Sequence, residues 1–193
     1  MTAASVALLP MPPRPDAALP VAERVRAMLA LGRTWVGQTE HPPGSNRGPL
    51  PDLLADALGE PRGLAWCARA AGVLRRWARL WVPPRDVGNC DAWRYYAEQA
   101  GLWRAQGALP LAQPPAGSVV LYTTWRPLES GPYAGGGRSD AVHAGLLLPT
   151  DDRGRPRGAL EGNTSARDFD ARGGAMVAKP VHRPAVYGYV LPA

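Results

Sequence analysis

Four side chains in this sequence have the types and spacing needed for nucleophilic catalysis. Cys67 follows a turn and begins an amphipathic stretch, where the unpaired N–H groups of a helix N-terminus would stabilise a thiolate. His143 opens a β-type run after a glycine-rich segment, a position that suits a general base. Glu161 and Asn163 lie at the end of the next β-type run, and either could hold the second ring nitrogen of the histidine. This order predicts a nucleophile, a base and an orienting group.

Each of these residues also has an ordinary structural interpretation. Cys67 alone is compatible with a small buried apolar residue, and His143 with a histidine on an edge strand. The Gly-Asn pair before Thr164 is a strong turn signal. His41 and His182, the two other histidines, are alternative bases. The combination favours catalysis because a helix-borne cysteine, then a strand-borne histidine and its orienting group, follow each other in the papain-like order.

The surrounding hydrophobic pattern predicts an α+β fold, with N-terminal helices packed on a C-terminal antiparallel β-sheet. Helical stretches are expected at residues 20–31 (ended by Gly32), 49–58 (capped by Gly59), 64–81 (stopped by Pro83-Pro84) and 89–100 (with Asn89 as N-cap). Short β-type runs are expected at 118–124, 143–149, 158–162, 175–181 and 185–191, with a long loop at 125–142. We predict a proline-rich, extended or mobile arm over residues 1–19 and a single catalytic domain over residues 20–193.

Length and composition limit the class of protein. The chain has 193 residues, of which 46% are hydrophobic and 20% charged, so it can bury the core of one domain and is neither collagen-like nor wholly disordered. The net charge is +6, and Lys179 is the only lysine. This arginine-rich charge reflects either a GC-rich genome or attraction to a polyanion. The basic residues are spread along the chain and match no nucleic-acid motif, so no nucleic acid is expected as a partner.

Cysteine content and the N-terminal sequence indicate where such a chain is made. Two cysteines, Cys67 and Cys90, are too few for a secreted domain held by disulfides. We expect both to be reduced and Cys90 to be structural; a second reactive thiol, or a disulfide that blocks Cys67, is the alternative. The N-terminus lacks a basic region, and no apolar run suits membrane insertion. We expect synthesis in the cytoplasm, with action elsewhere after release or delivery, no cofactor and no metal site.

Five stretches of the sequence, in one order, resemble the motifs of a known family. That family is the cysteine, histidine-dependent amidohydrolase/peptidase (CHAP) superfamily, in its phage-endolysin and bacterial wall-hydrolase branch. The stretches are Thr39-Glu40 with Asn46-Arg47-Gly48-Pro49 and Asp52; Trp66-Cys67-Ala68; Pro115-Ala116-Gly117-Ser118-Val119-Val120; His143-Ala144-Gly145; and Glu161-Gly162-Asn163-Thr164. The resemblance runs from about residue 35 to the end of the chain. Ser118 departs from the family's aspartate, and Ala144 from a larger aliphatic residue.

The resemblance implies a papain-like CHAP fold and a peptidoglycan hydrolase. Cys67 would be the nucleophile and His143 the general base and acid. Glu161 would orient the imidazole, with Asn163 as an auxiliary or alternative partner. The protein would act as a monomer on bacterial peptidoglycan and cut an amide bond in or next to the stem peptide through a thioester intermediate.

Further residues are predicted to bind the substrate, and the biological setting has alternatives. Glu40 and Asn46, in a polar loop, are expected to contact the stem peptide. Trp66 and Trp125 are candidates to line the site, where a tryptophan can stack on a sugar ring, and filling of the core is the alternative for both. The favoured setting is a bacteriolytic phage endolysin. The alternatives are an interbacterial toxin with the same chemistry and a peptidoglycan-binding module without catalysis.

Overall fold

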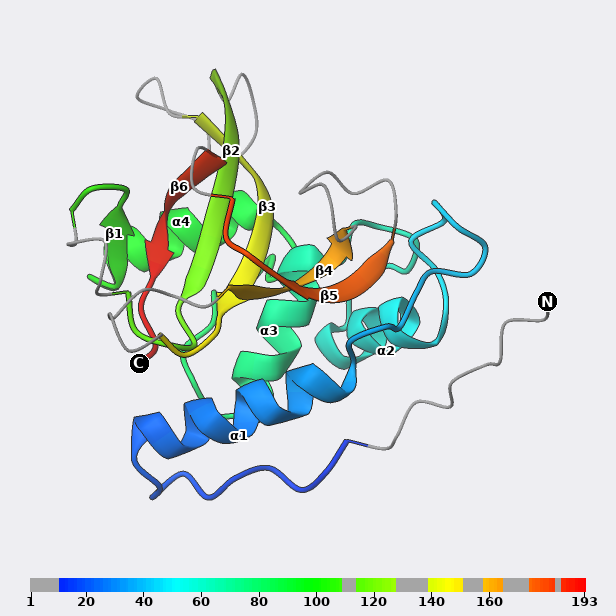
Figure 1. Ribbon diagram of the computed structural model, residues 1–193, viewed down its shortest axis with the longest axis horizontal. Coiled ribbons are helices and arrows are strands. Elements are labelled where there is room, and N and C mark those ends of the chain that lie inside the picture. The colour runs from blue at the N-terminus through cyan, green and yellow to red at the C-terminus, as the bar shows by residue number, and fades with distance from the viewer. Residues whose placement is uncertain (1–10, 109–113, 128–138, 151–157, 165–173, 183–184) are drawn as a thin grey trace.

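Helices come first along the chain, and an antiparallel sheet whose strands differ in length follows (Figure 1). The computed structural model describes residues 11–108, 114–127, 139–150, 158–164, 174–182 and 185–193, with the backbone alone at 124–127 and 139–140. Within these ranges the helices are α1 (Val21–Thr34), α2 (Pro49–Leu58), α3 (Cys67–Trp77) and α4 (Cys90–Gln99). The strands are β1 (Trp103–Ala105), β2 (Val119–Pro127), β3 (Ser139–Leu147), β4 (Ala159–Thr164), β5 (Ala175–Lys179) and β6 (Val186–Val190). The predicted α+β class is confirmed.

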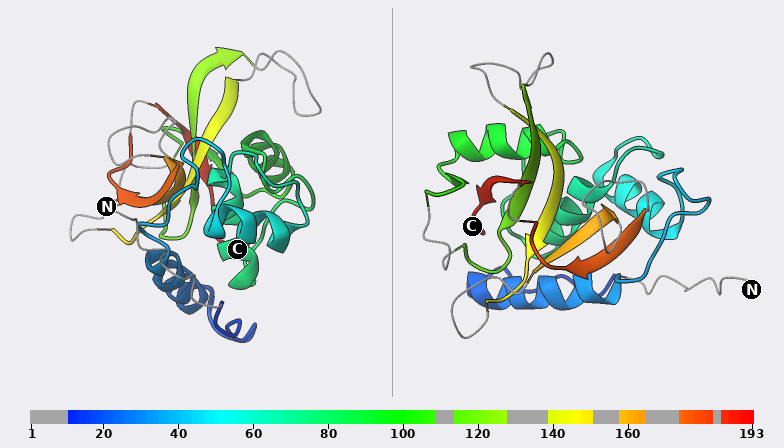
Figure 2. Two further views of the ribbon diagram at one scale, coloured as in Figure 1. Left: turned by 90° about the vertical axis from the view of Figure 1, so that its right-hand side faces the viewer. Right: turned by 45° about the horizontal axis from the view of Figure 1, so that its top comes forward.

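The sheet has the order β1-β6-β2-β3-β4-β5, and every neighbouring pair is antiparallel. Figure 2 shows α2, α3 and α4 on one side of the sheet and α1 along one end. Side chains alternate along β2, so Val119 and Leu121 join the large core beneath the helices. Val120 and Tyr122 join a smaller cluster with Val186 on β6. The central strands are therefore buried on both faces, which gives the site a rigid base.

Helix boundaries follow the sequence signals only in part. α2 begins at Pro49 and is capped by Gly59 in the left-handed conformation, as predicted. α1 does not end at Gly32 but continues to Thr34. A Cβ on Gly32 would lie 2.9 Å from Leu160 Cδ1, so this glycine allows α1 to approach β4 closely instead of ending the helix.

The helix that carries Cys67 is shorter than its hydrophobic pattern predicts. α3 ends at Trp77, well before Pro83-Pro84, because Arg79 adopts a φ of 55° and the N–H of Leu80 turns back to the carbonyl of Arg75. The prediction for this C-terminus was wrong. The helix starts at Cys67, as the turn before this residue predicts, although the helical pattern begins at residue 64, and this end of the helix positions the sulfur.

The N-terminal arm lies against the helices where the structure describes it. The indole Nε1 of Trp77 donates to the carbonyl of Pro12 at 2.8 Å, and Arg79 Nε donates to the carbonyl of Pro15 at 3.1 Å. Of the extended or mobile arm predicted, residues 11–19 are thus anchored against the helices, and residues 1–10 lie outside the described part. Also unpredicted is the short strand β1, which pairs with β6. Among the described helices, none is long and apolar enough to cross a membrane.

Arg75 on α3 is fully buried, although its side chain is charged. Its guanidinium donates to the carbonyls of Trp81 and Leu191 at 2.9 and 3.0 Å, and to those of Gly117 and Val190 at 3.4 and 3.3 Å. Burial lowers the pKa of Arg75 to about 9. The side chain thereby joins α3 to β6 and to the segment before β2.

Replacing Arg75 with methionine should destabilise the fold by about 3 kcal/mol, because several buried carbonyls lose their donor. Urea unfolding followed by circular dichroism measures this change. The matched control is Arg76→Met, at the next and only half-buried position, which should change stability by less than about 0.5 kcal/mol. Equal stability of the two variants would contradict the role given to Arg75.

Candidate functional site

Cys67 is the first residue of α3, and its sulfur lies at a helix N-terminus with free N–H groups. Trp66 is the N-cap and provides no side-chain hydrogen bond to the first turn. No acidic residue occupies that turn. The orphan N–H groups and the partial positive charge of the helix end are therefore left for a thiolate or for an anionic ligand.

The histidine and its partners come from neighbouring strands of the sheet. In the register of the sheet, Tyr122 on β2 lies opposite His143 on β3, and Gly145 lies opposite Glu161 on β4. The rings of Tyr122 and His143 stack with centroids 5.6 Å apart. A register shift falls next to this pair, since Thr123 pairs with Ala141. Such bulges bend a strand and redirect its side chains, and this one adjoins His143.

The Glu161 carboxylate is the centre of a buried polar network. Its Oε2 lies 3.0 Å from His143 Nε2 and 3.1 Å from Lys179 Nζ, and its Oε1 accepts from the Tyr122 hydroxyl at 2.6 Å. Lys179 also donates to Thr164 Oγ1 at 2.9 Å. Burial opposes ionisation of Glu161, but the hydrogen bonds from His143 and Tyr122 and the nearby positive charges lower its pKa below the ordinary value. The carboxylate is therefore held ionised against the imidazole.

The pKa shifts of Cys67 and His143 both favour a thiolate beside an imidazolium. The pKa of Cys67 is well below its ordinary value, first because Cys90 donates a hydrogen bond to it, and then because of the charge and hydrogen bond of His143 and the N–H of Ala144; burial opposes them. Burial also acts against the protonated form of His143, but the Cys67 thiolate and Glu161 outweigh it and raise the pKa of His143 to about 9. With Nε2 held by Glu161, Nδ1 is left to face the sulfur.

The second cysteine belongs to the same site. Cys90 Sγ lies 3.8 Å from Cys67 Sγ, and both thiols are free and buried. Cys90 begins α4, whose N-cap is Asn89 as predicted, with its side chain accepting from the N–H of Asp91 at 2.8 Å. The pKa of Cys90 is raised well above its ordinary value, chiefly because its thiol donates to Cys67. It is therefore a neutral thiol beside a thiolate.

Among the described residues Asn163 does not join this network, and His182 contacts it through its backbone, which forms a hydrogen bond with Tyr122. The described residues show no hydrogen bond between Asn163 and His143, and Asn163 Oδ1 is buried without a partner there. The backbone of Asn163 has a φ of 56°, as its turn signal suggests. Glu161 is thus the side chain that holds the imidazole. His41 and His182 are exposed, so His143 is the histidine that the fold brings to Cys67.

The residues predicted to bind substrate are placed differently from one another. Trp66 is fully buried, and its indole Nε1 donates to Glu40 Oε1 at 2.9 Å. Glu40 is 4% exposed, so this pair supports the start of α3 from inside, and the prediction of a direct substrate contact is corrected for both. Asn46 is half-buried in the loop before α2 with a φ of 53°. Trp125 lies in β2, but its side chain is outside the described residues.

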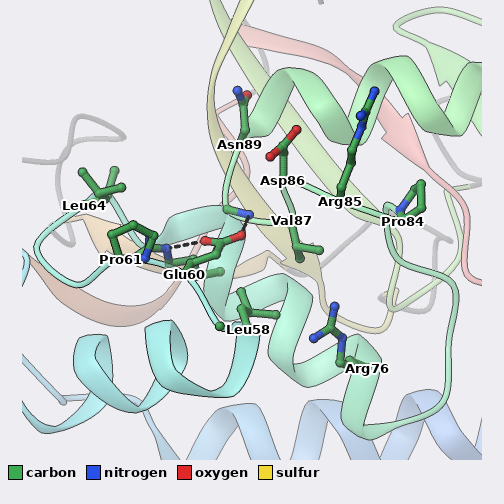
Figure 3. A pocket seen from close by; sticks show the side chains of 14 residues that line it. Leu58, Glu60, Pro61, Leu64, Arg76, Pro84, Arg85, Asp86, Val87 and Asn89 are labelled. Atoms are coloured by element: carbon green, nitrogen blue, oxygen red, sulfur yellow. Dashed lines mark hydrogen bonds and ion pairs between the residues drawn. The ribbon is translucent and has the colours of Figure 1, made fainter. Parts of the chain in front are cut away.

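A pocket with a volume of about 820 Å³ lies between the end of α2, one face of α3 and residues 84–89 (Figure 3). Ala65 and Asn89 line it, and each lies close in sequence to one of the two cysteines. Its wall includes Glu60, which accepts from Arg69 Nε and from the N–H of Gly88, both at 2.8 Å. The pocket thus lies near the N-termini of α3 and α4, but neither cysteine nor His143 is among the residues that line it.

Sequence reasoning missed three members of the site: Tyr122, Lys179 and the thiol of Cys90 as a partner of Cys67. Lys179 carried a signal, since it is the only lysine of the chain and lies in an apolar run. The described residues contain no group of three histidine, cysteine or acidic side chains that could hold a metal ion.

Comparison with known proteins found no similar protein. No protein-family model matches the chain, and no curated protein or solved structure matches it either.

Proposed function

We propose that this protein is a cysteine-dependent amide hydrolase with a papain-like CHAP fold, acting on bacterial peptidoglycan. The observation that carries the proposal is that a cysteine at a helix N-terminus meets an imidazole that a buried carboxylate holds at 3.0 Å. A thiolate paired with a positioned acid is the arrangement that acyl transfer from an amide requires.

In the first half of the proposed reaction, Cys67 Sγ attacks the carbonyl carbon of the amide. The C=O electron pair moves to oxygen, and the first-turn N–H groups of α3 stabilise this oxyanion. The imidazolium of His143 gives its proton to the leaving nitrogen, and the C–N bond breaks. The products are a thioester on Cys67, a released amine and a neutral imidazole held by Glu161.

In the second half, water hydrolyses the thioester. His143, now neutral, accepts a proton from the water as its oxygen attacks the carbonyl carbon. The C–S bond breaks, a carboxylic acid leaves and the thiolate returns beside the imidazolium. The Glu161 network keeps the imidazole in one orientation through both halves.

Peptidoglycan as the substrate rests on the motif resemblance, and the net charge of +6 suits an anionic wall. We place the cleaved bond in or next to the stem peptide and the protein in the setting of a phage endolysin. Incubation with purified peptidoglycan, followed by mass spectrometry of the released muropeptides, tests this assignment. Products with a new free amine and a new carboxyl at one amide are expected. If a folded protein with a reactive Cys67 releases no muropeptides, peptidoglycan is rejected as the substrate.

The rate of hydrolysis should depend on pH as a bell-shaped curve. Activity needs Cys67 ionised and His143 protonated, so it rises as pH passes the lowered pKa of the thiol and falls as pH passes the His143 pKa of about 9. We expect a plateau through neutral pH and a loss of about tenfold per pH unit above the alkaline limb. Measurement of kcat/KM on a soluble muropeptide from pH 4 to about 11 tests this profile. Activity that keeps rising above pH 9 would contradict the ion pair.

A further inference from the structure

Two cysteines begin two different helices, and their sulfur atoms meet. Cys67 is the first residue of α3 and Cys90 the first residue of α4, with Sγ atoms 3.8 Å apart. Each residue is less than a tenth exposed. Helix geometry alone would favour ionisation of both, but two thiolates at this distance would repel each other in a poorly solvated site. One sulfur must therefore keep its proton.

The helix N-termini differ in a way that decides which sulfur keeps it. α3 has no side-chain cap and no acidic residue in its first turn, and His143 faces its cysteine. α4 is capped by Asn89, and Asp91 directly follows Cys90, so this end offers fewer free N–H groups and carries a negative charge. The asymmetry makes Cys67 the thiolate and Cys90 the S–H donor.

The position of Cys90 is fixed from the strand that carries the histidine. Asp91 Oδ1 accepts a hydrogen bond from the N–H of Ala141 at 2.9 Å, two residues before His143 on β3. α4 also packs against β3. One strand therefore sets both the imidazole and, through Asp91, the second thiol against the sulfur of Cys67.

We propose that Cys90 is a positioning residue for Cys67: its thiol donates a hydrogen bond to the Cys67 sulfur, keeps that sulfur ionised and directs it. No covalent change of Cys90 is involved, and the donor stays protonated through the reaction. The proposal deepens the proposed hydrolase function, but its test follows the sulfur itself and does not depend on the substrate.

The test measures how the alkylation of Cys67 by iodoacetamide depends on pH, with peptide mass spectrometry to follow this cysteine alone. Only the thiolate reacts, so the midpoint of the rate reports its ionisation. In the full-length Cys90→Ala variant the midpoint should rise by at least about one pH unit, because a hydrogen bond to a charged acceptor is lost. At a pH below both midpoints the alkylation rate should then be about tenfold lower than in the wild type.

Two further variants separate hydrogen bonding from packing. Cys90→Ser keeps a donor and should shift the midpoint less than Cys90→Ala. Cys90→Val fills the space without a donor, so it should behave like Cys90→Ala, and it decides the matter if the alanine variant does not fold. A purely structural role would lower the unfolding temperature and leave the midpoint unchanged.

An unchanged midpoint in both Cys90→Ala and Cys90→Val would overturn the proposal, as would an equal shift in Cys90→Ser. Its failure is distinguishable from failure of the proposed function. If the midpoint shifts as expected in a protein that does not digest peptidoglycan, Cys90 remains a positioning residue, and only the assignment of peptidoglycan as the substrate is rejected.

Discussion

Replacing Cys67 with alanine should abolish release of muropeptides from peptidoglycan. The expected loss in kcat is on the order of 10⁴-fold or more, because no other group in the site can form the thioester. Cys90 cannot replace Cys67 as the nucleophile, since its pKa is raised well above the ordinary value and it begins a different helix, α4. Loss of turbidity of permeabilised bacteria and mass spectrometry of soluble products measure the effect.

The first control is to verify that the Cys67→Ala variant is folded. Cys67 lies in the main core, so removal of its sulfur should cost about 1 kcal/mol of stability, and the near-UV circular dichroism should be retained. A second control is His41→Ala, which changes an exposed loop histidine and should keep wild-type activity. Full lysis by a folded Cys67→Ala variant would reject the cysteine mechanism.

The start of α3 could be predicted from sequence, whereas its end could not, and the reason is conformational. Gly59 and the prolines of α2 mark boundaries because their backbone preferences are intrinsic. Arg79 ends α3 in a left-handed conformation without a glycine, so no local residue type signals it. The tertiary contact of Arg79 with Pro15 in the arm accompanies this turn. Such an end depends on contacts that a hydrophobic pattern does not contain.

The site shows the same division between local and tertiary information. Chain order was sufficient to pair Cys67 with His143 and to suggest Glu161 or Asn163 as the partner. Choosing between the last two needs the register of β3 against β4, which places Gly145 opposite Glu161. The role of Trp66 stayed open between substrate contact and core, because an aromatic residue beside a nucleophile looks the same in sequence whether it faces substrate or supports the helix from within.

Replacing Glu161 with glutamine should lower kcat by about 10²- to 10⁴-fold. The amide oxygen can still accept from His143 Nε2, but the negative charge that favours the imidazolium is removed, and Lys179 loses its ionic partner. Charge and hydrogen bonding by Glu161 contribute to the raised pKa of His143, so the alkaline limb of the rate profile should move to lower pH.

Tyr122→Phe is the matched variant, because Tyr122 touches the other oxygen of the same carboxylate. It removes the 2.6 Å hydrogen bond to Glu161 Oε1 and leaves the charge and the His143 contact in place. We expect a loss of no more than about tenfold in kcat and a smaller displacement of the alkaline limb. The comparison requires that both variants unfold cooperatively, which thermal denaturation checks.

The two variants together distinguish a charged orienting group from a neutral one. If the carboxylate acts through its charge, Glu161→Gln moves the alkaline limb down, and Tyr122→Phe moves it less. If Glu161 only holds the ring in place, the glutamine variant keeps both the limb and most of the rate, because its amide oxygen still accepts the same hydrogen bond. Wild-type kcat and an unmoved limb in a folded Glu161→Gln variant would therefore show that the ionised form of this buried side chain is not needed by the imidazole.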